Sequence, residues 1–301
     1  MTAVEATRVT KTFGAVTAVD AASFAIPEGA ITGLLGRNGA GKTTLMNLIT
    51  GQDFATSGTL RVFGERPVEN PRVLSRVCFI KESQSYPDSY RGRHVLAMAP
   101  HFFPHYDAAL ADRLVADFDV PLSRPVKKMS RGQRSALGAI VGIASRAELT
   151  LLDEPYAGLD AVARHVFYDR LLEDYAEHPR TVVLSTHLID EAADLLERVI
   201  VIHGGRIVID EEAEDLRGTA STVVGRHADV EAFVAGRDVM SRERVGGIAS
   251  ATVAGLSAHD KARAAESGLE VTAVSLQQLI VRRTGGDPHD ARTHTTEEAS
   301  S

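Results

Sequence analysis

A glycine-rich stretch near the amino terminus constrains this chain more than any other feature of its sequence. Residues 36–43 read Gly-Arg-Asn-Gly-Ala-Gly-Lys-Thr, which matches the phosphate-loop pattern G-x-x-x-x-G-K-[ST]. The apolar run 31–35 before it predicts a buried strand, and Leu45, Leu48 and Ile49 after it share one helix face. Strand, glycine loop and helix in this order predict a nucleoside triphosphate site, because glycines let backbone N–H groups approach phosphates closely.

The last two residues of this loop have separate expected roles. Lys42 is expected to reach the β- and γ-phosphates, and Thr43 is expected to place its hydroxyl on Mg²⁺. A glycine-rich turn that binds nothing is the alternative interpretation. The strand before the loop and the helix after it favour the phosphate site.

The composition is that of an ordinary water-soluble protein. The chain has 301 residues, 44% apolar and 24% charged, which is enough for one large domain and a small one. A net charge of −7 gives no general attraction to nucleic acid, and no nucleic-acid partner is expected. No apolar run approaches the ~20 residues of a membrane span. The single cysteine, Cys78, is expected to be core filling in a reducing cytoplasm.

Predicted strands and helices alternate through the first two thirds of the chain. Residues 9–26 suggest short antiparallel strands, and the 161–177 segment predicts a helix. Alternation of this kind predicts a mostly parallel sheet covered by helices, interrupted by a helical insertion at about 85–147. The further strands are expected at 58–63, 77–80, 149–152, 181–185, 199–203 and 206–210.

The character of the sequence changes after residue 218. We expect one domain over residues 1–218, a small α/β appendix over 219–284, and a polar disordered tail over 285–301. The appendix is expected to contain strands at 222–224, 251–253 and 269–274 and helices at 229–235, 260–267 and 276–283.

Two acidic residues close one of the predicted strands. Residues 149–152 are apolar and are followed directly by Asp153 and Glu154. Phosphate chemistry needs a second carboxylate near the metal, so Asp153 is expected to hold Mg²⁺. Glu154 is then placed to polarise the attacking water. A solvated strand end is the alternative, and the phosphate loop upstream favours the catalytic interpretation.

Two more polar residues lie at predicted boundaries. Ser130 precedes a helical pattern as a typical N-cap, and free N–H groups at a helix start attract anions. His187 follows the 181–185 strand, which is expected to end near the phosphates. Contact with the γ-phosphate is therefore favoured over a structural role for this histidine.

Together these motifs resemble the nucleotide-binding subunit of an ATP-binding-cassette (ABC) transporter over residues 5–215. The resemblance implies an α/β fold with a P-loop NTPase (RecA-like) core, an antiparallel β subdomain and an inserted helical subdomain. It also implies ATP hydrolysis, with ATP and Mg²⁺ as cofactors. The matching segments, in the family's order, are Walker A at 36–44, the signature at 130–133, Walker B at 149–154, the D-loop at 157–160 and the switch histidine at His187.

The resemblance carries roles over to individual residues. Phe13 falls where the family has an aromatic ring that stacks on adenine. The implied catalytic residues are Glu154, His187 and Lys42; the implied Mg²⁺ ligands are Thr43, Asp153 and Glu82; the implied ATP contacts are Phe13, Gly36, Arg37, Asn38, Gly39, Ala40, Gly41, Lys42, Thr43, Thr44, Ser130, Gly132, Gln133 and Asp160.

The resemblance also implies partners. Two such domains dimerise head to tail, as a homodimer or a heterodimer, and Ser130 and Gly132 of one complete the site at Lys42 of the other. A subunit of this kind works with a separate transmembrane permease, as a cytoplasmic protein peripheral to the inner face of the cell membrane. Export is the favoured direction. The aromatic stretch 101–107 is either core or part of the surface that receives the permease.

Four positions depart from the family pattern. Phe13 replaces the usual Tyr, and its ring still allows stacking. Arg131 replaces the middle Gly of Ser-Gly-Gly-Gln, and Tyr156 stands where Thr is common, without an interpretation from sequence. The Q-loop position holds Glu82, with Gln84 two residues on. We expect Glu82 to fill the role, because a carboxylate binds Mg²⁺ more tightly than an amide.

A soluble ABC ATPase that acts as an assembly or regulatory scaffold is the alternative function. Repair ATPases carry long coiled-coil insertions, and the stretch between Thr43 and Ser130 leaves no room for one. Translation ABC proteins carry two cassettes on one chain, and this chain has one. Co-purification with a membrane protein would favour transport over the scaffold.

Overall fold

The chain folds into two compact units. The computed structural model describes residues 1–82 and 84–283, and the predicted tail at 285–301 lies outside these residues. One unit, called the cassette below, comprises residues 1–188 and 194–210. The other, called the C-terminal unit, comprises residues 189–193 and the chain from 211 onward. No pattern in the sequence predicts that residues 189–193 group with the C-terminal unit.

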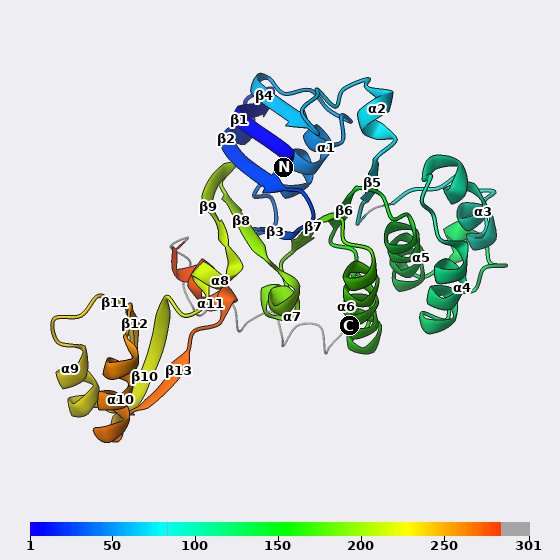
Figure 1. Cartoon of the computed structure of the whole chain (residues 1–301). Helices are drawn as coiled ribbons and strands as arrows, with labels where there is room; N and C mark the ends of the chain where they lie inside the picture. The colour runs from blue at the N-terminus through cyan, green and yellow to red at the C-terminus, as the bar shows by residue number, and fades with distance from the viewer. Residues whose placement is uncertain (83, 284–301) are drawn as a thin grey trace. The chain divides into compact units, whose positions relative to one another are not determined.

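A six-stranded sheet forms the centre of the cassette (Figure 1). The strands lie in the order β5-β6-β7-β3-β8-β9, and the β5–β6, β6–β7, β7–β3 and β3–β8 pairs are parallel. The prediction of a mostly parallel sheet is therefore confirmed. The strands are β3 (Ile31–Leu35), β5 (Val77–Ile80), β6 (Leu149–Asp153), β7 (Thr181–Thr186), β8 (Arg198–His203) and β9 (Arg206–Glu212).

Three of these strands, β3, β6 and β7, are buried at every residue. Parallel strands buried on both faces read as continuous apolar runs, which is why the sequence located them well. Helix α1 (Lys42–Ile49) follows the phosphate loop, and the two longest helices described in the cassette are α5 (Arg131–Ala144) and α6 (Ala161–Glu177). The helix predicted at 161–177 is confirmed at both ends.

A second sheet of the cassette is antiparallel, as the sequence predicts for residues 9–26. Its order is β2-β1-β4, with β1 (Thr2–Phe13), β2 (Val16–Pro27) and β4 (Ser57–Val62). The first two strands are longer than expected. Irregular pairing between them interrupts the alternation of apolar and polar residues, which hides their length in the sequence.

The region expected to be helical contains three α-helices and a short 3₁₀ turn. Its elements are α3 (Gly92–Phe102), α4 (Ala108–Asp117), the turn Val126–Lys128, and α5. A short helix, α2 (Pro71–Leu74), precedes β5. Cys78 on β5 is buried, and burial raises the pKa of its thiol to about 12, so its expected role as core filling is confirmed.

The C-terminal unit has its own antiparallel sheet, in the order β11-β12-β10-β13. Strand β11 was not predicted from the sequence, which reads Val-Met-Ser-Arg-Glu-Arg-Val there. Edge strands of this kind carry charges in place of an alternating apolar pattern. The elements are α7 (Ile189–Ala192), α8 (Ala213–Leu216), β10 (Ala220–Arg226), α9 (His227–Val234), β11 (Val239–Val245), β12 (Ile248–Ala254), α10 (Ala258–Glu266), β13 (Glu270–Ala273) and α11 (Leu276–Arg283). A 3₁₀ turn, Ala193–Leu195, follows α7.

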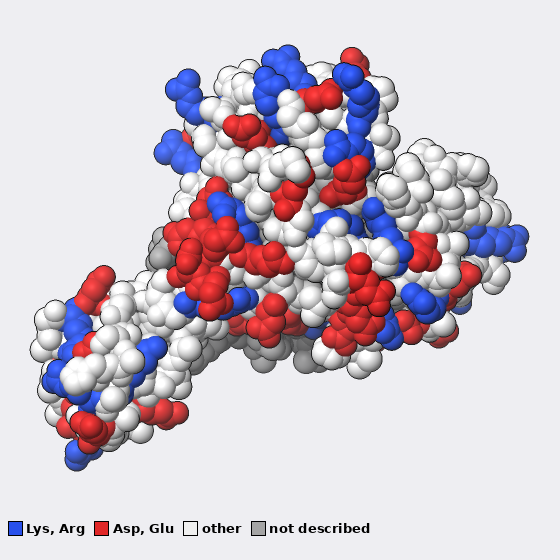
Figure 2. Space-filling model, viewed as in Figure 1, with Lys and Arg blue, Asp and Glu red and all other residues white. Residues whose placement is uncertain are grey.

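Acidic side chains gather in patches on the face shown in Figure 2, and basic side chains lie around these patches. Elsewhere on the chain, acidic and basic side chains pair at the surface, for example Arg170 with Asp117 at 2.8 Å and Arg76 with Glu148. Exposed pairs of this kind contribute little to stability individually.

Candidate functional site

The predicted chemistry gathers at one edge of the parallel sheet. The phosphate loop begins at Gly36 directly after β3, and Asp153 and Glu154 stand at the end of β6. His187 follows β7, and Glu82 follows β5. The carboxyl ends of parallel strands meet at one edge, which is the usual place for ligands in open α/β sheets. Four sequence-distant motifs are thereby brought together.

The glycines of the loop are required by its geometry. Gly36 and Gly41 have φ angles of +155° and +112°. A Cβ at Gly36 would lie 2.4 Å from the Ile202 carbonyl oxygen, and one at Gly41 would lie 2.4 Å from the Ala18 carbonyl oxygen. Both positions therefore exclude any larger residue, and the loop keeps its backbone path close to β2 and β8.

Helix α1 begins at Lys42 without a side-chain cap, and Gly41 is its N-cap residue. The N–H groups of the first turn therefore point out of the helix start without a side-chain acceptor, as an anion site requires. The side chain of Lys42 is buried, and its Nζ donates to the Gly36 carbonyl at 2.7 Å. This hydrogen bond fixes the Lys42 ammonium against the first residue of the phosphate loop.

A hydroxyl and a carboxylate meet where the metal is expected. Thr43 Oγ1 donates to Asp153 Oδ2 at 2.7 Å. Asp153 is 3% exposed, and its Oδ1 has no hydrogen-bond partner among the described residues. A buried carboxylate oxygen without a partner is costly. It fits a divalent cation, for which carboxylate and hydroxyl oxygens are suitable ligands.

Glu154 lies in the middle of a hydrogen-bonded group. Its Oε2 is 2.7 Å from His187 Nδ1 and accepts from the Tyr156 hydroxyl at 2.6 Å. Its Oε1 is buried without a hydrogen-bond partner in the described chain and lies 3.8 Å from Lys42 Nζ. The backbone of Glu154 has a φ of +48°, a strained conformation for this residue type.

The same contacts set the pKa values of the pair. Burial alone raises the pKa of Glu154, but hydrogen bonds from His187 and Tyr156 outweigh it and bring the net pKa below its ordinary value. The hydrogen bond to Glu154 raises the pKa of His187, against an opposing effect of burial. Glu154 is therefore ionised at neutral pH, as a general base must be.

The signature residues form a second group around the start of α5. Ser130 is the N-cap of α5, as predicted, and its Oγ accepts from the Gln133 N–H at 3.1 Å. Gln133 Oε1 in turn accepts from the Ser130 N–H at 3.2 Å. A Cβ on Gly132 would lie 2.4 Å from the Gly158 carbonyl oxygen, so the D-loop packs against the signature. Asp160 caps α6 through the Ala163 N–H.

The two Q-loop candidates have different neighbours. The Glu82 carboxylate pairs with the guanidinium of Arg131, so two departures from the family pattern contact each other. Gln84 Oε1 accepts from the Lys81 N–H at 3.3 Å within its own turn. Glu82 also acts on the pKa of His187, which it raises, whereas Gln84 is turned toward the local backbone.

Phe13 lies at the end of β1, and half of its surface is exposed. Lys11 Nζ lies 4.7 Å from the centre of its ring. An exposed ring at a strand end is available for stacking with a planar ligand.

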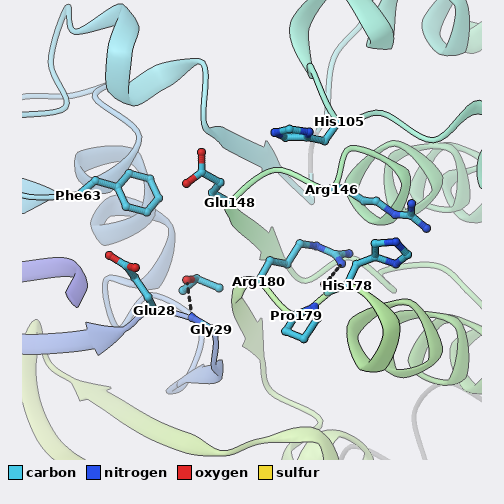
Figure 3. A pocket seen from close by; sticks show the side chains of 10 residues that line it. Glu28, Gly29, Phe63, His105, Arg146, Glu148, His178, Pro179 and Arg180 are labelled. Atoms are coloured by element: carbon cyan, nitrogen blue, oxygen red, sulfur yellow. Dashed lines mark hydrogen bonds between the residues drawn. The ribbon is translucent and has the colours of Figure 1, made fainter. Parts of the chain in front are cut away.

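A pocket of about 550 Å³ lies at the opposite edge of the sheet (Figure 3). Glu28 and Gly29 precede β3, Glu148 precedes β6, and Thr181 begins β7, so the amino ends of the parallel strands border it. None of the residues predicted for nucleotide binding or catalysis lines this pocket. The candidate site at the carboxyl edge is therefore separate from this pocket.

Comparison with known proteins decides between families that share a phosphate loop. A family model described as ABC transporter matches residues 19–157. The bacitracin transport ATP-binding protein BcrA of Enterococcus faecalis is 30% identical over 218 residues, which cover 71% of this chain and 70% of that protein. The chain belongs to the ABC transporter family.

Two further ABC relatives match a smaller share of their own length. The ABC transporter ATP-binding protein YtrB of Bacillus subtilis is 30% identical, over 59% of this chain and 61% of that protein. The Nod factor export ATP-binding protein I of Sinorhizobium fredii is 33% identical, over 69% of this chain and 62% of that protein. The chain thus spans less than two thirds of these two relatives.

Solved structures agree on the ABC fold. A structure described as the ATP binding subunit of an ABC transporter aligns with a TM-score of 0.63 at 23% identity, over 71% of this chain and 91% of that one. The predicted P-loop NTPase fold of an ABC ATPase is therefore confirmed. In the part of the chain that the structure describes, no helix has the length and apolar character of a bilayer span.

Sequence reasoning missed the role of Tyr156 in this ABC site. In the sequence, Tyr156 is a departure from the family pattern, and the hydrogen-bond partners of its hydroxyl could not be predicted. Where that hydroxyl points depends on β7 and the residues after it, which are remote in sequence.

Proposed function

We propose that this chain is the ATP-hydrolysing motor subunit of an ABC exporter. The observation that carries the proposal is the pair of buried carboxylate oxygens without partners, Asp153 Oδ1 and Glu154 Oε1, beside the phosphate loop. Burial of such charged groups is costly, and a ligand or a reaction that uses them explains why the fold keeps them. ATP is the nucleotide that this family binds.

Different residues at the carboxyl edge bind different parts of Mg-ATP in this proposal. The N–H groups of the loop from Gly36 to Thr44 and the Lys42 ammonium hold the triphosphate, and Phe13 stacks on the adenine. Thr43 and Asp153, whose oxygens already face each other at 2.7 Å, would hold Mg²⁺. Bound there, the cation would neutralise charge on the phosphates. Glu82 is our candidate for a third oxygen ligand.

Glu154 is the general base in this proposal. Its Oε1 accepts a proton from the attacking water, whose oxygen bonds to the γ-phosphorus while the bond to the β-bridging oxygen breaks and ADP leaves. Lys42, 3.8 Å from Oε1, helps to keep this carboxylate ionised. His187, held at Oε2, is our candidate for the γ-phosphate contact.

The signature group acts on a second subunit. Ser130, Gly132 and Asp160 complete the nucleotide site of a partner cassette in a head-to-tail dimer, either with an identical chain or with a different one. Gln133 supports this group by capping α5. Binding of ATP closes the dimer, and hydrolysis releases it.

A transmembrane permease is the proposed partner of the helical region. Phe102, at the end of α3, is 63% exposed, and Met98 one turn earlier is 38% exposed. Exposed apolar side chains on one helix suit a partner surface. Export is supported by a relative named for Nod factor export, and transport in general by a relative named for bacitracin transport. The chain would then sit in the cytoplasm, peripheral to the inner face of the cell membrane.

Glu154→Gln tests the proposal. We expect the variant to bind ATP like the parent, to lose turnover by at least about a hundredfold, and to accumulate as an ATP-bound dimer in size-exclusion chromatography. Glu148→Gln is the matched control, because Glu148 flanks the same strand at its other end. Parent-like turnover in Glu154→Gln would show that Glu154 is not the base.

Two further measurements address the partners and the Q-loop. A polytopic membrane protein that co-purifies with the chain would support transport, whereas soluble partners alone would favour the scaffold function. Loss of turnover in Glu82→Ala with retention in Gln84→Ala would support Glu82 as the Q-loop residue. The reverse result would assign the role to Gln84.

A further inference from the structure

Tyr156 is a buried residue two positions after the proposed base. It is 2% exposed, and its ring lies 6.2 Å from that of Tyr168 on α6 and 6.1 Å from that of His187. The Leu159 N–H donates to the Tyr156 carbonyl at 2.8 Å, which fixes the backbone of the turn. Packing on two sides and a closed turn leave the phenol a single position.

The phenol hydroxyl has a complete set of partners. It donates to Glu154 Oε2 at 2.6 Å and accepts from the His187 backbone N–H at 3.3 Å. Its third partner is Thr186 Oγ1, which itself accepts from the Leu188 N–H at 2.8 Å. The hydroxyl proton of Thr186 is therefore available for the phenol oxygen, and the phenol proton is committed to Glu154.

The two oxygens of Glu154 consequently have different surroundings. Oε2 is held by Tyr156 and His187, whereas Oε1 has no hydrogen-bond partner among the described residues. A carboxylate fixed by one oxygen keeps the other in a constant direction. Burial and the charge of Glu154 raise the pKa of the Tyr156 phenol, so it is a neutral donor at neutral pH.

We propose that Tyr156 is a positioning residue that holds Glu154 by Oε2, so that Oε1 faces the attacking water, and that ties this carboxylate to the backbone of His187. The inference rests on the proposed role of Glu154 as general base. In this chain the base and the switch histidine share one phenol, so a shift of the segment after β7 moves both together.

Tyr156→Phe tests the proposal in the full chain with Mg-ATP as substrate. The ring and its packing remain, and one donor to a charged group is lost, so we expect kcat to fall about tenfold. KM and the affinity for a non-hydrolysable ATP analogue should stay within about twofold, because no ATP contact is removed. Thermal unfolding of the variant verifies that the fold is retained.

Tyr175→Phe is the matched control. The Tyr175 hydroxyl also donates to a carboxylate, Glu197 Oε1 at 2.7 Å, and lies beside Gly29 at the amino edge of the sheet. We expect its kcat to equal that of the parent. An equal fall of kcat in both variants would show a general effect of losing a hydrogen-bonded phenol hydroxyl and would overturn the proposal.

The Glu154→Gln background separates positioning from structure. If Tyr156 acts through Glu154, adding Tyr156→Phe to Glu154→Gln should leave the residual turnover unchanged, because no base remains to be positioned. A further tenfold fall there would overturn the proposal. If Glu154→Gln alone is inactive, two results for the single variant Tyr156→Phe would also overturn the proposal. One is a kcat equal to that of the parent, and the other is a raised KM with unchanged kcat. Parent-like turnover in Glu154→Gln would instead overturn both this inference and the proposed function.

Discussion

Charged side chains are buried at both edges of the central sheet, but the two edges differ in how many of the buried carboxylate oxygens have hydrogen-bond partners. At the amino edge, Asp174 is 5% exposed and accepts from Arg146 Nε at 3.0 Å and Arg180 Nη1 at 2.7 Å. At the carboxyl edge, Asp153 Oδ1 and Glu154 Oε1 have no hydrogen-bond partner in the described part of the chain. Buried charge alone is therefore a poor marker of function, because pairing makes it structural.

The pocket in Figure 3 illustrates the same contrast. Arg146 and Arg180 line it, yet both guanidinium groups are bound to carboxylates of the fold. A pocket lined by basic residues resembles an anion-binding site, but these arginines already bind carboxylates of the protein. The carboxyl edge has carboxylate oxygens without a hydrogen-bond partner among the described residues and a helix start without a side-chain cap, and both are suited to a ligand.

The largest expected effect concerns the unpaired carboxylate. Asp153→Asn should lower ATP turnover about a thousandfold, because a metal ligand loses its charge. The free energy of unfolding without nucleotide should change by less than about 1 kcal/mol, since no ion pair is broken. Steady-state ATPase assays and urea denaturation measure the two quantities.

Asp169→Asn, on the exposed surface of α6, is the control and should change neither turnover nor stability. A loss of stability in Asp153→Asn comparable to that expected for the paired Asp174 would remove the distinction between the two edges.

The paired carboxylate should behave in the opposite way. Asp174→Asn leaves Arg180 without its buried counter-charge, and we expect the free energy of unfolding to fall by about 3 kcal/mol. Turnover per folded molecule should stay near that of the parent, because no nucleotide contact changes. Denaturation curves, with ATPase rates normalised to the folded fraction, provide the test. The neighbouring Glu173→Gln, which pairs only at the surface with Arg170, should be nearly neutral.

A smaller, pH-dependent effect is expected at Asp107. Its carboxylate accepts the Leu110 N–H at the start of α4 and faces Arg146, and these contacts lower its pKa despite partial burial. A lowered pKa stabilises the fold above the ordinary value of 3.8, and the stabilisation is lost as pH falls through the folded pKa. Asp107→Asn keeps a capping side chain and removes only the charge.

We expect this variant to be about 0.5–1 kcal/mol less stable than the parent at pH 7. The difference should shrink below pH 3.8 and disappear in more acidic solution. Chemical denaturation at a series of pH values measures it. Asp112→Asn, on the exposed side of α4, is the control, and a difference that grows toward acid would contradict the assignment.

The smallest effect is expected for the exposed pair of Glu82 and Arg131. Their side chains are 46% and 62% exposed, so solvent screens them. A double-mutant cycle of Glu82→Gln and Arg131→Gly should give a coupling of about 0.5 kcal/mol in the free energy of unfolding at low salt, and none in 1 M salt. A coupling of several kcal/mol would mean that the carboxyl edge also relies on pairing for stability.

Much of the fold could be predicted because the local signals agree. The strands from 31 to 210 that are buried on both faces read as apolar runs, and the helix at Ala161–Glu177 is bounded by Asp160 and Pro179. β11 could not be predicted, because an edge strand with charged side chains lacks a core-facing pattern. The grouping of residues 189–193 with the C-terminal unit could not be predicted from the sequence either, because it depends on contacts between residues that are distant in sequence.

The sequence by itself determined the loop, the ordered motifs and hence the family, because phosphate chemistry restricts which residues can stand at fixed spacings. Only the tertiary structure decided which charges are paired. It brought Arg131 to Glu82, two departures that are separate in the sequence, and it turned the Tyr156 hydroxyl onto Glu154. A side chain's partner depends on which strands lie next to each other, and that order is a property of the folded sheet.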